Sequence, residues 1–227
     1  GKAECVEKRT ILEEQHLQRT NDRVNEFKRV VNILNEDLDF GSAQEAMYDA
    51  IACDISMTGK PLSRWCEFVL EHMSAEMHEE INVALRHMKK FFILNSDENF
   101  KACKYLLFVV VDDHLNNNDV KTWQEMRFAY CNLISEALKH KQIDKLLLPY
   151  LFTADQRLTQ SEIAHTALTS VFFIFLQSGF SEIKQIHIGG VCSNESYHMY
   201  YANELETIVR NMLHADDENC NPVVVNT

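Results

Sequence analysis

The segment Glu98-Asn-Phe-Lys-Ala-Cys-Lys-Tyr-Leu-Leu-Phe-Val-Val-Val111 is strongly apolar, and its secondary structure decides the fold class. Val109–Val111 alone would suit a β-strand, because β-branched residues are enriched in strands. The apolar residues of the whole segment, however, recur at helical spacing: Phe100, Cys103, Leu106, Leu107 and Val110. This periodicity predicts a buried helix over residues 98–111.

The same spacing extends outward along the chain. Further helices are expected at 2–38, 43–57, 62–73, 75–94, 120–140, 143–152, 159–177 and 193–214. Ser42 with Glu45, then Ser74, and then Thr159 or Ser161 supply N-caps for three of these helices. Residues 186–190 form either a break or a short extended piece.

Glycine and proline are scarce in this chain. It has 227 residues but only 6 Gly and 3 Pro, where average usage would give roughly 16 and about 11. Many-stranded β folds need these residues in their turns, and phosphate loops need glycine. The sequence therefore predicts an all-α protein, an irregular helical-repeat stack of the HEAT or armadillo type with about nine or ten helices. A single compact helical bundle is the alternative.

Domain organisation and compartment follow from charge and cysteine usage. We expect one helical domain over residues 1–215, beginning with a long charged helix at 1–38, and a flexible acidic tail at 216–227. The net charge of −12 makes the chain a poor default nucleic-acid binder. Seven scattered cysteines without a C-x-x-C pair indicate free thiols in an intracellular protein, nuclear or cytoplasmic. No apolar run reaches 18 residues, so no membrane partner is expected.

Catalytic motifs are missing from the sequence. It contains no G-x-G-x-x-G, P-loop, G-x-S-x-G or H-E-x-x-H pattern, which predicts a non-enzyme without a cofactor. Glu-x-x-His pairs place a carboxylate and an imidazole on one helix face, as in di-iron bundles. The weak metal candidates are Glu162, His165, Glu195 and His198. A metal-dependent helical-bundle enzyme is therefore a minor alternative.

Two groups of residues are candidates for interaction. Lysines cluster near the ends of neighbouring expected helices, where they could form one basic ridge for an acidic peptide or RNA backbone: Lys89, Lys90, Lys101, Lys104, Lys139, Lys141 and Lys145. Aromatic residues of the kind enriched in interfaces open the last helix: Tyr197, Tyr200 and Tyr201. Lysines near helix C-termini also stabilise helices by themselves, and the tyrosines could equally close the core.

The function favoured by these patterns is a non-enzymatic helical scaffold or adaptor. It would bind another protein or a peptide through a groove or helix face, as one part of a larger intracellular protein or complex. The alternative is an RNA-associated adaptor that uses the central lysines. Self-association through residues 1–38 is a further hypothesis.

Overall fold

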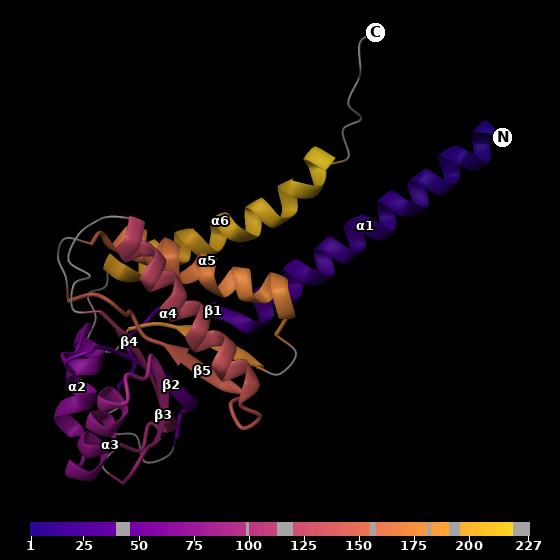
Figure 1. The fold of residues 1–227 in the computed structure, drawn as a ribbon. Coiled ribbons are helices and arrows are strands. Elements are labelled where there is room, and N and C mark those ends of the chain that lie inside the picture. Colours follow the sequence, from indigo (N-terminus) through magenta and orange to yellow (C-terminus); the bar gives the residue numbers. More distant parts are fainter. Residues whose placement is uncertain are drawn as a thin grey trace.

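The computed structural model describes residues 1–39, 46–98, 100–112, 120–154, 158–180, 183–190 and 196–219. The described residues form both helices and strands (Figure 1). The helices are α1 (Lys2–Val30), α2 (Arg64–His72), α3 (Ala75–Arg86), α4 (Val120–Lys139), α5 (Gln160–Ser178) and α6 (Ser196–Asn219). The strands are β1 (Val31–Ile33), β2 (Tyr48–Ser56), β3 (Phe91–Asn95), β4 (Cys103–Val111), β5 (Lys145–Leu148) and β6 (Gln185–Ile188).

The strands form one mixed sheet in the order β1-β6-β5-β2-β4-β3. All neighbours in this sheet pair in parallel except β3, which is antiparallel to β4. Helices α2 and α3 cover one face, and α1, α4, α5 and α6 lie on the other (Figure 1). The prediction of an all-α helical repeat, and of the compact bundle as its alternative, is therefore wrong.

The segment that misled the prediction is the central strand β4. Leu106, Phe108 and Val110 pack toward α2 and α3, whereas Leu107, Val109 and Val111 pack toward the opposite helical layer. Because both faces of a parallel sheet are buried, such a strand is apolar at every position and shows no alternation. A short continuous apolar run cannot be told from a buried helix by periodicity.

Four other expected helices also contain strands. The segment 2–38 contains β1, 43–57 contains β2, 143–152 contains β5, and the end of 75–94 contains most of β3. The Ser42–Glu45 capping box lies outside the described residues. Other predictions are confirmed: Ser74 accepts a hydrogen bond from the backbone N–H of Met77, and Thr159 accepts one from Glu162, at the starts of α3 and α5.

The scarcity of glycine and proline has a different cause from the one inferred. Hairpin turns require these residues, but parallel strands are joined by crossover helices. Among the described strands only β3 and β4 pair in antiparallel fashion, so the sheet has little need of hairpin turns. Gly59, at a φ of 84°, supports the turn after β2.

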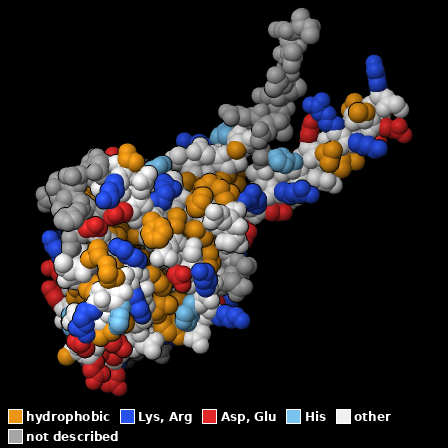
Figure 2. Space-filling model, in the orientation of Figure 1, with side chains coloured by type: hydrophobic (Ala, Val, Ile, Leu, Met, Phe, Trp, Pro, Cys, Tyr) orange, Lys and Arg blue, Asp and Glu red, His pale blue; other side chains and the backbone are white. Residues whose placement is uncertain are grey.

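Helix α1 extends away from the sheet (Figure 1). It ends at Val30, where the chain becomes the edge strand β1, rather than at residue 38. Its last turns are anchored by Val24, Phe27 and Val30, and the ring of Phe27 contacts Phe172 and Phe175 of α5. Figure 2 shows charged side chains along its projecting part and hydrophobic ones gathered over α4 and α5. No described helix is long and apolar enough to cross a membrane.

Candidate functional site

The topology marks one place at the edge of the sheet. From β2 the chain passes to β3 and β4 on one side, and then crosses to β5 and β6 on the other side. The strand order therefore reverses between β2 and β5. In open α/β sheets, ligands bind outside the carboxyl ends of the strands at such a reversal. We call the meeting point of the residues 57–63, which follow β2, and 149–154, which follow β5, the switch point.

Asp54 lies at the centre of the switch point. It is close to the carboxyl end of β2, and its side chain is fully buried. One carboxylate oxygen accepts a hydrogen bond of 2.5 Å from the Ser63 hydroxyl, and the other accepts one of 2.7 Å from the backbone N–H of Phe152. Ser63 is also the N-cap of α2. A single side chain thus joins both loops.

Backbone contacts reinforce this closure. The N–H of Ala154 donates to the carbonyl of Leu62 over 3.0 Å, and the N–H of Leu62 donates to the carbonyl of Asp54 over 3.0 Å. Phe152 adopts a φ of 61°, which is uncommon for a residue other than glycine. Such a conformation persists only where the surroundings hold it, here through the N–H bound to Asp54.

The carboxyl of Asp54 lies in an unusual electrostatic environment. Burial raises its pKa to about 7, although the hydrogen bonds from Ser63 and Phe152 act in the opposite direction. Burial likewise raises the pKa of the Tyr130 and Tyr201 phenols, and the charge of Asp54 adds to both shifts. The two phenol hydroxyls face each other and also affect each other's pKa. The switch point therefore holds a buried cluster of polar groups around Asp54.

Two exposed cations lie beside the switch point. They are Lys60, in the loop after β2, and Arg64, at the start of α2. Farther along this edge, a cleft of about 290 Å³ between the end of β4 and the start of α4 is lined by two lysines and two acids, Lys90, Lys121, Asp112 and Glu125. An anionic ligand is therefore favoured at Lys60 and Arg64 rather than in this cleft.

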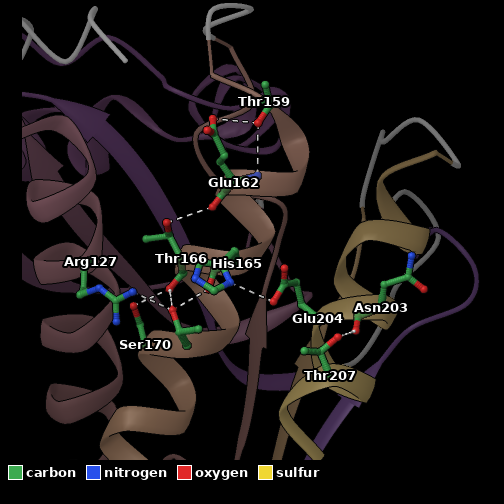
Figure 3. Close-up of polar contacts among 10 residues, drawn as sticks. Arg127, Thr159, Glu162, His165, Thr166, Ser170, Asn203, Glu204 and Thr207 are labelled. Carbon is green, nitrogen blue, oxygen red and sulfur yellow. Dashed lines mark hydrogen bonds and ion pairs between the residues drawn. The ribbon is translucent and has the colours of Figure 1, made fainter. Parts of the chain in front are cut away.

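A second cleft, of about 480 Å³, lies among α4, α5 and α6. His165 and Glu162, two of the metal candidates, line it but have separate partners (Figure 3). The Nδ1 atom of His165 lies 3.1 Å from the Glu204 carboxylate on α6, whereas Glu162 accepts a hydrogen bond of 2.8 Å from the Thr159 hydroxyl. Arg127, from α4, donates to the Thr169 hydroxyl over 2.8 Å.

The remaining metal candidates do not complete a site. Glu195 lies outside the described residues, and His198 is half-buried on α6. Among the residues that the structure describes, no group of three or more His, Cys, Asp or Glu side chains is arranged to hold a metal ion.

The lysine candidates divide between the two edges of the sheet. Lys89 and Lys90 directly precede β3, which is antiparallel, and therefore lie at the carboxyl edge of the parallel strands. The other five lie near the amino edge: Lys101, Lys104, Lys139, Lys141 and Lys145. Within this second group, Lys104 pairs with Asp49 and Lys139 with Glu136. The structure does not bring the seven lysines onto one ridge.

The tyrosine candidates have different environments. Tyr201 is fully buried and stacks on Tyr150 with ring centroids 4.5 Å apart. Tyr197 makes an edge contact with the same ring, and Tyr200 is 41% exposed. Two of the three therefore close the core above β5, which was one of the two open interpretations.

Sequence reasoning missed Asp54 and Ser63. Asp54 is one of six acidic residues between Asn35 and Gly59, a segment without lysine or arginine, and so does not stand out by charge. Its signal is a single carboxylate inside an otherwise apolar run, Ala50-Ile-Ala-Cys-Asp-Ile55, followed by a Gly59–Pro61 turn. Burying a charged side chain in a strand costs folding free energy unless the side chain is hydrogen-bonded. The presence of Asp54 in this run therefore indicates that the fold supplies hydrogen-bond partners for it.

Comparisons with known proteins give a clear result for the fold. No family model and no curated protein matches the sequence. Among solved structures, a mutant of the Oceanobacillus iheyensis macrodomain superimposes with a TM-score of 0.62 at 11% identity, covering 81% of this chain and 95% of that chain. The macro domain of ganglioside induced differentiation associated protein 2 gives 0.59 at 12% identity, covering 79% and 86%.

Two further similar structures of the Oceanobacillus iheyensis macrodomain contain ligands. A mutant with ADPR (ADP-ribose) has a TM-score of 0.60 at 13% identity, covering 81% of this chain and 96% of that chain. The same macrodomain with ADP gives 0.59 at 13% identity, covering 81% and 94%. At these identities the comparisons show the fold alone, which is macrodomain-like.

The functional predictions need correction for the same reason. The predicted non-enzymatic helical scaffold with a protein or peptide partner is wrong, because the fold is a macrodomain-like α/β fold and not a helical stack. RNA binding along one ridge loses its basis because the lysines are separated. Self-association through residues 1–38 stays a prediction, although Val31–Ile33 of that segment form β1 and the last turns of α1 are buried against the domain. The metal-dependent helical bundle is excluded by the sheet.

Proposed function

We propose that this chain binds a nucleoside diphosphate ligand of the ADP-ribose type at the carboxyl edge of its sheet. The observation that carries the proposal is the fold likeness, which spans nearly the whole length of macrodomains whose structures include ADPR and ADP. The reversal of strand order between β2 and β5 independently selects the same edge as the ligand-binding edge of an open sheet.

The charges at this edge support a phosphate-containing ligand. Lys60 and Arg64 flank the switch point and are exposed, so they can approach an anion without a loss of existing packing. The N-terminal ends of α2 and α5 also face this edge, capped by Ser63 and Thr159. Helix N-termini carry a partial positive charge that favours phosphate groups.

Titration calorimetry with ADP-ribose tests the proposal. We expect binding at low ionic strength that weakens with added salt, because exposed cations contribute to it. The double variant Lys60→Glu with Arg64→Glu should weaken binding by roughly tenfold or more.

Lys141→Glu is the matched control, because Lys141 is equally exposed but lies at the amino edge of the sheet. It should bind ADP-ribose like the wild type. Absence of measurable binding to the wild-type chain at millimolar ligand, or an equal loss in the Lys141→Glu control, would contradict the proposal.

A further inference from the structure

The donors at the switch point converge on one carboxylate. The Ser63 hydroxyl at the start of α2 and the Phe152 N–H in the opposite loop both point to Asp54, over 2.5 and 2.7 Å. A hydroxyl at a helix N-terminus and a loop N–H are groups that commonly hold phosphate oxygens. Here an anionic group of the chain itself occupies them.

We propose that Asp54 is a specificity-determining residue of the nucleotide site: its carboxylate takes, from within the chain, the place of a ligand phosphate and so weakens the binding of diphosphate ligands. This inference rests on the function proposed above and adds a restriction on the ligand. The diphosphate is held at the outer rim by Lys60 and Arg64, and the part of the ligand nearest to Asp54 is uncharged and carries hydroxyl groups.

The surroundings of Asp54 leave its charge without a counter-ion. The titratable groups that face it are the thiols of Cys53 on β2 and Cys66 on α2 and the phenols of Tyr130 on α4 and Tyr201 on α6. Within the described residues, no Lys, Arg or His forms an ion pair with Asp54. Its negative charge therefore acts on an incoming phosphate through a poorly screened interior.

The hydroxyls of Tyr130 and Tyr201 belong to the same cluster. Both rings are buried, and the two hydroxyls face each other. Both phenols are neutral, since burial raises the pKa of each. The groups beside Asp54 are therefore neutral and hydroxyl-bearing, which suits a ligand group of the same kind.

The inference is tested by measuring the affinity for ADP-ribose of the wild-type chain and of the Asp54→Asn variant between about pH 6 and about pH 8.5. ADP-ribose has no terminal phosphate, so its own charge stays constant over this range. Because the pKa of Asp54 is about 7, the wild type should bind more weakly as the pH rises. The variant should bind roughly fivefold to tenfold more tightly than the wild type at the upper end, without this pH dependence.

Asp49→Asn is the control, because Asp49 is a hydrogen-bonded carboxylate at the amino end of the same strand. Its affinity should follow that of the wild type. Equal affinities of wild type and Asp54→Asn at every pH would overturn the role of Asp54 and leave the proposed function standing. If neither chain binds ADP-ribose, both proposals fail. If Asp54→Asn does not fold, the wild-type pH profile decides, and a flat profile overturns the inference.

Discussion

The carboxylate of Asp54, in β2, accepts a hydrogen bond of 2.7 Å from the backbone N–H of Phe152, 98 residues further along the chain. This contact lies where the sheet reverses its strand order. It joins two loops that must both be in place before the carboxyl edge has a defined shape. Its consequence for stability can be measured without any ligand.

Replacing Asp54 with Asn should change how stability depends on pH. Burial raises the pKa of Asp54 from 3.8 to about 7, so the folded state holds a proton that the unfolded state releases. The stability from this group is complete below about pH 4 and is lost as the pH rises through 7. The unfolding free energy of Asp54→Asn, compared with that of the wild type, should rise by about 2 to 3 kcal/mol as the pH increases from 5 to 8. Urea unfolding at both pH values tests this, and parallel profiles would disprove it.

For Asp49, at the other end of β2, we expect the opposite dependence of stability on pH. Burial disfavours its charged form, but hydrogen bonds from the N–H groups of Lys145 and Asp144, and the Lys104 ammonium, outweigh burial and lower its pKa. The stability from Asp49 is therefore present at neutral pH and lost as the pH falls through the lowered value. Asp49→Asn should be less stable than the wild type by about 1 kcal/mol at pH 7. The deficit should shrink below about pH 4; a constant deficit would contradict this explanation.

His187 of β6 offers a spectroscopic test of the sheet's register. Its Nδ1 atom lies 2.9 Å from the Tyr48 hydroxyl of β2, across the intervening strand β5. Burial, and then the charge of Lys145, lower the pKa of His187. Lys145→Met should raise this pKa toward the ordinary value of about 6.5, as followed by NMR of the imidazole nitrogens. Lys184→Met is the control, and an unchanged His187 pKa in Lys145→Met would contradict the arrangement.

Gly189 is required by a close approach between the ends of β6 and β1. A Cβ atom at this position would lie 2.6 Å from the Cβ atom of Leu34. Gly189→Ala should therefore destabilise the fold by about 1 to 3 kcal/mol in chemical unfolding. In a Leu34→Gly background the same substitution should cost much less, because the colliding atom is gone. Additive effects of the two changes would argue against this contact.

The helices that sequence reasoning located correctly share a visible signal. Helices α4 and α5 begin and end within one residue of the expected positions, and α6 begins within three residues of its expected start but runs to Asn219 rather than 214. Each is longer than 18 residues and has a polar or half-exposed side, so its periodicity survives in the sequence. Capping residues such as Ser74 and Thr159 mark the helix starts locally.

The candidate site around Asp54 could not be predicted from the sequence for a related reason. Asp54, Ser63 and Phe152 come from three separate segments, and no spacing between them repeats a known motif. Glu162 and His165 had the spacing of a metal pair, yet the fold gives each a different partner. Side-chain types at fixed spacing indicate chemistry only when the element that carries them is known.

The sequence by itself determined where the long amphipathic helices lie, because hydrophobic periodicity and caps are local properties. Only the tertiary structure decided that the short apolar runs Tyr48–Ser56, Cys103–Val111 and Lys145–Leu148 are strands. A strand buried on both faces loses its alternation, and its backbone hydrogen bonds go to partners far away in the chain. The same long-range pairing places Asp54 against Phe152, and so it decided the candidate site as well.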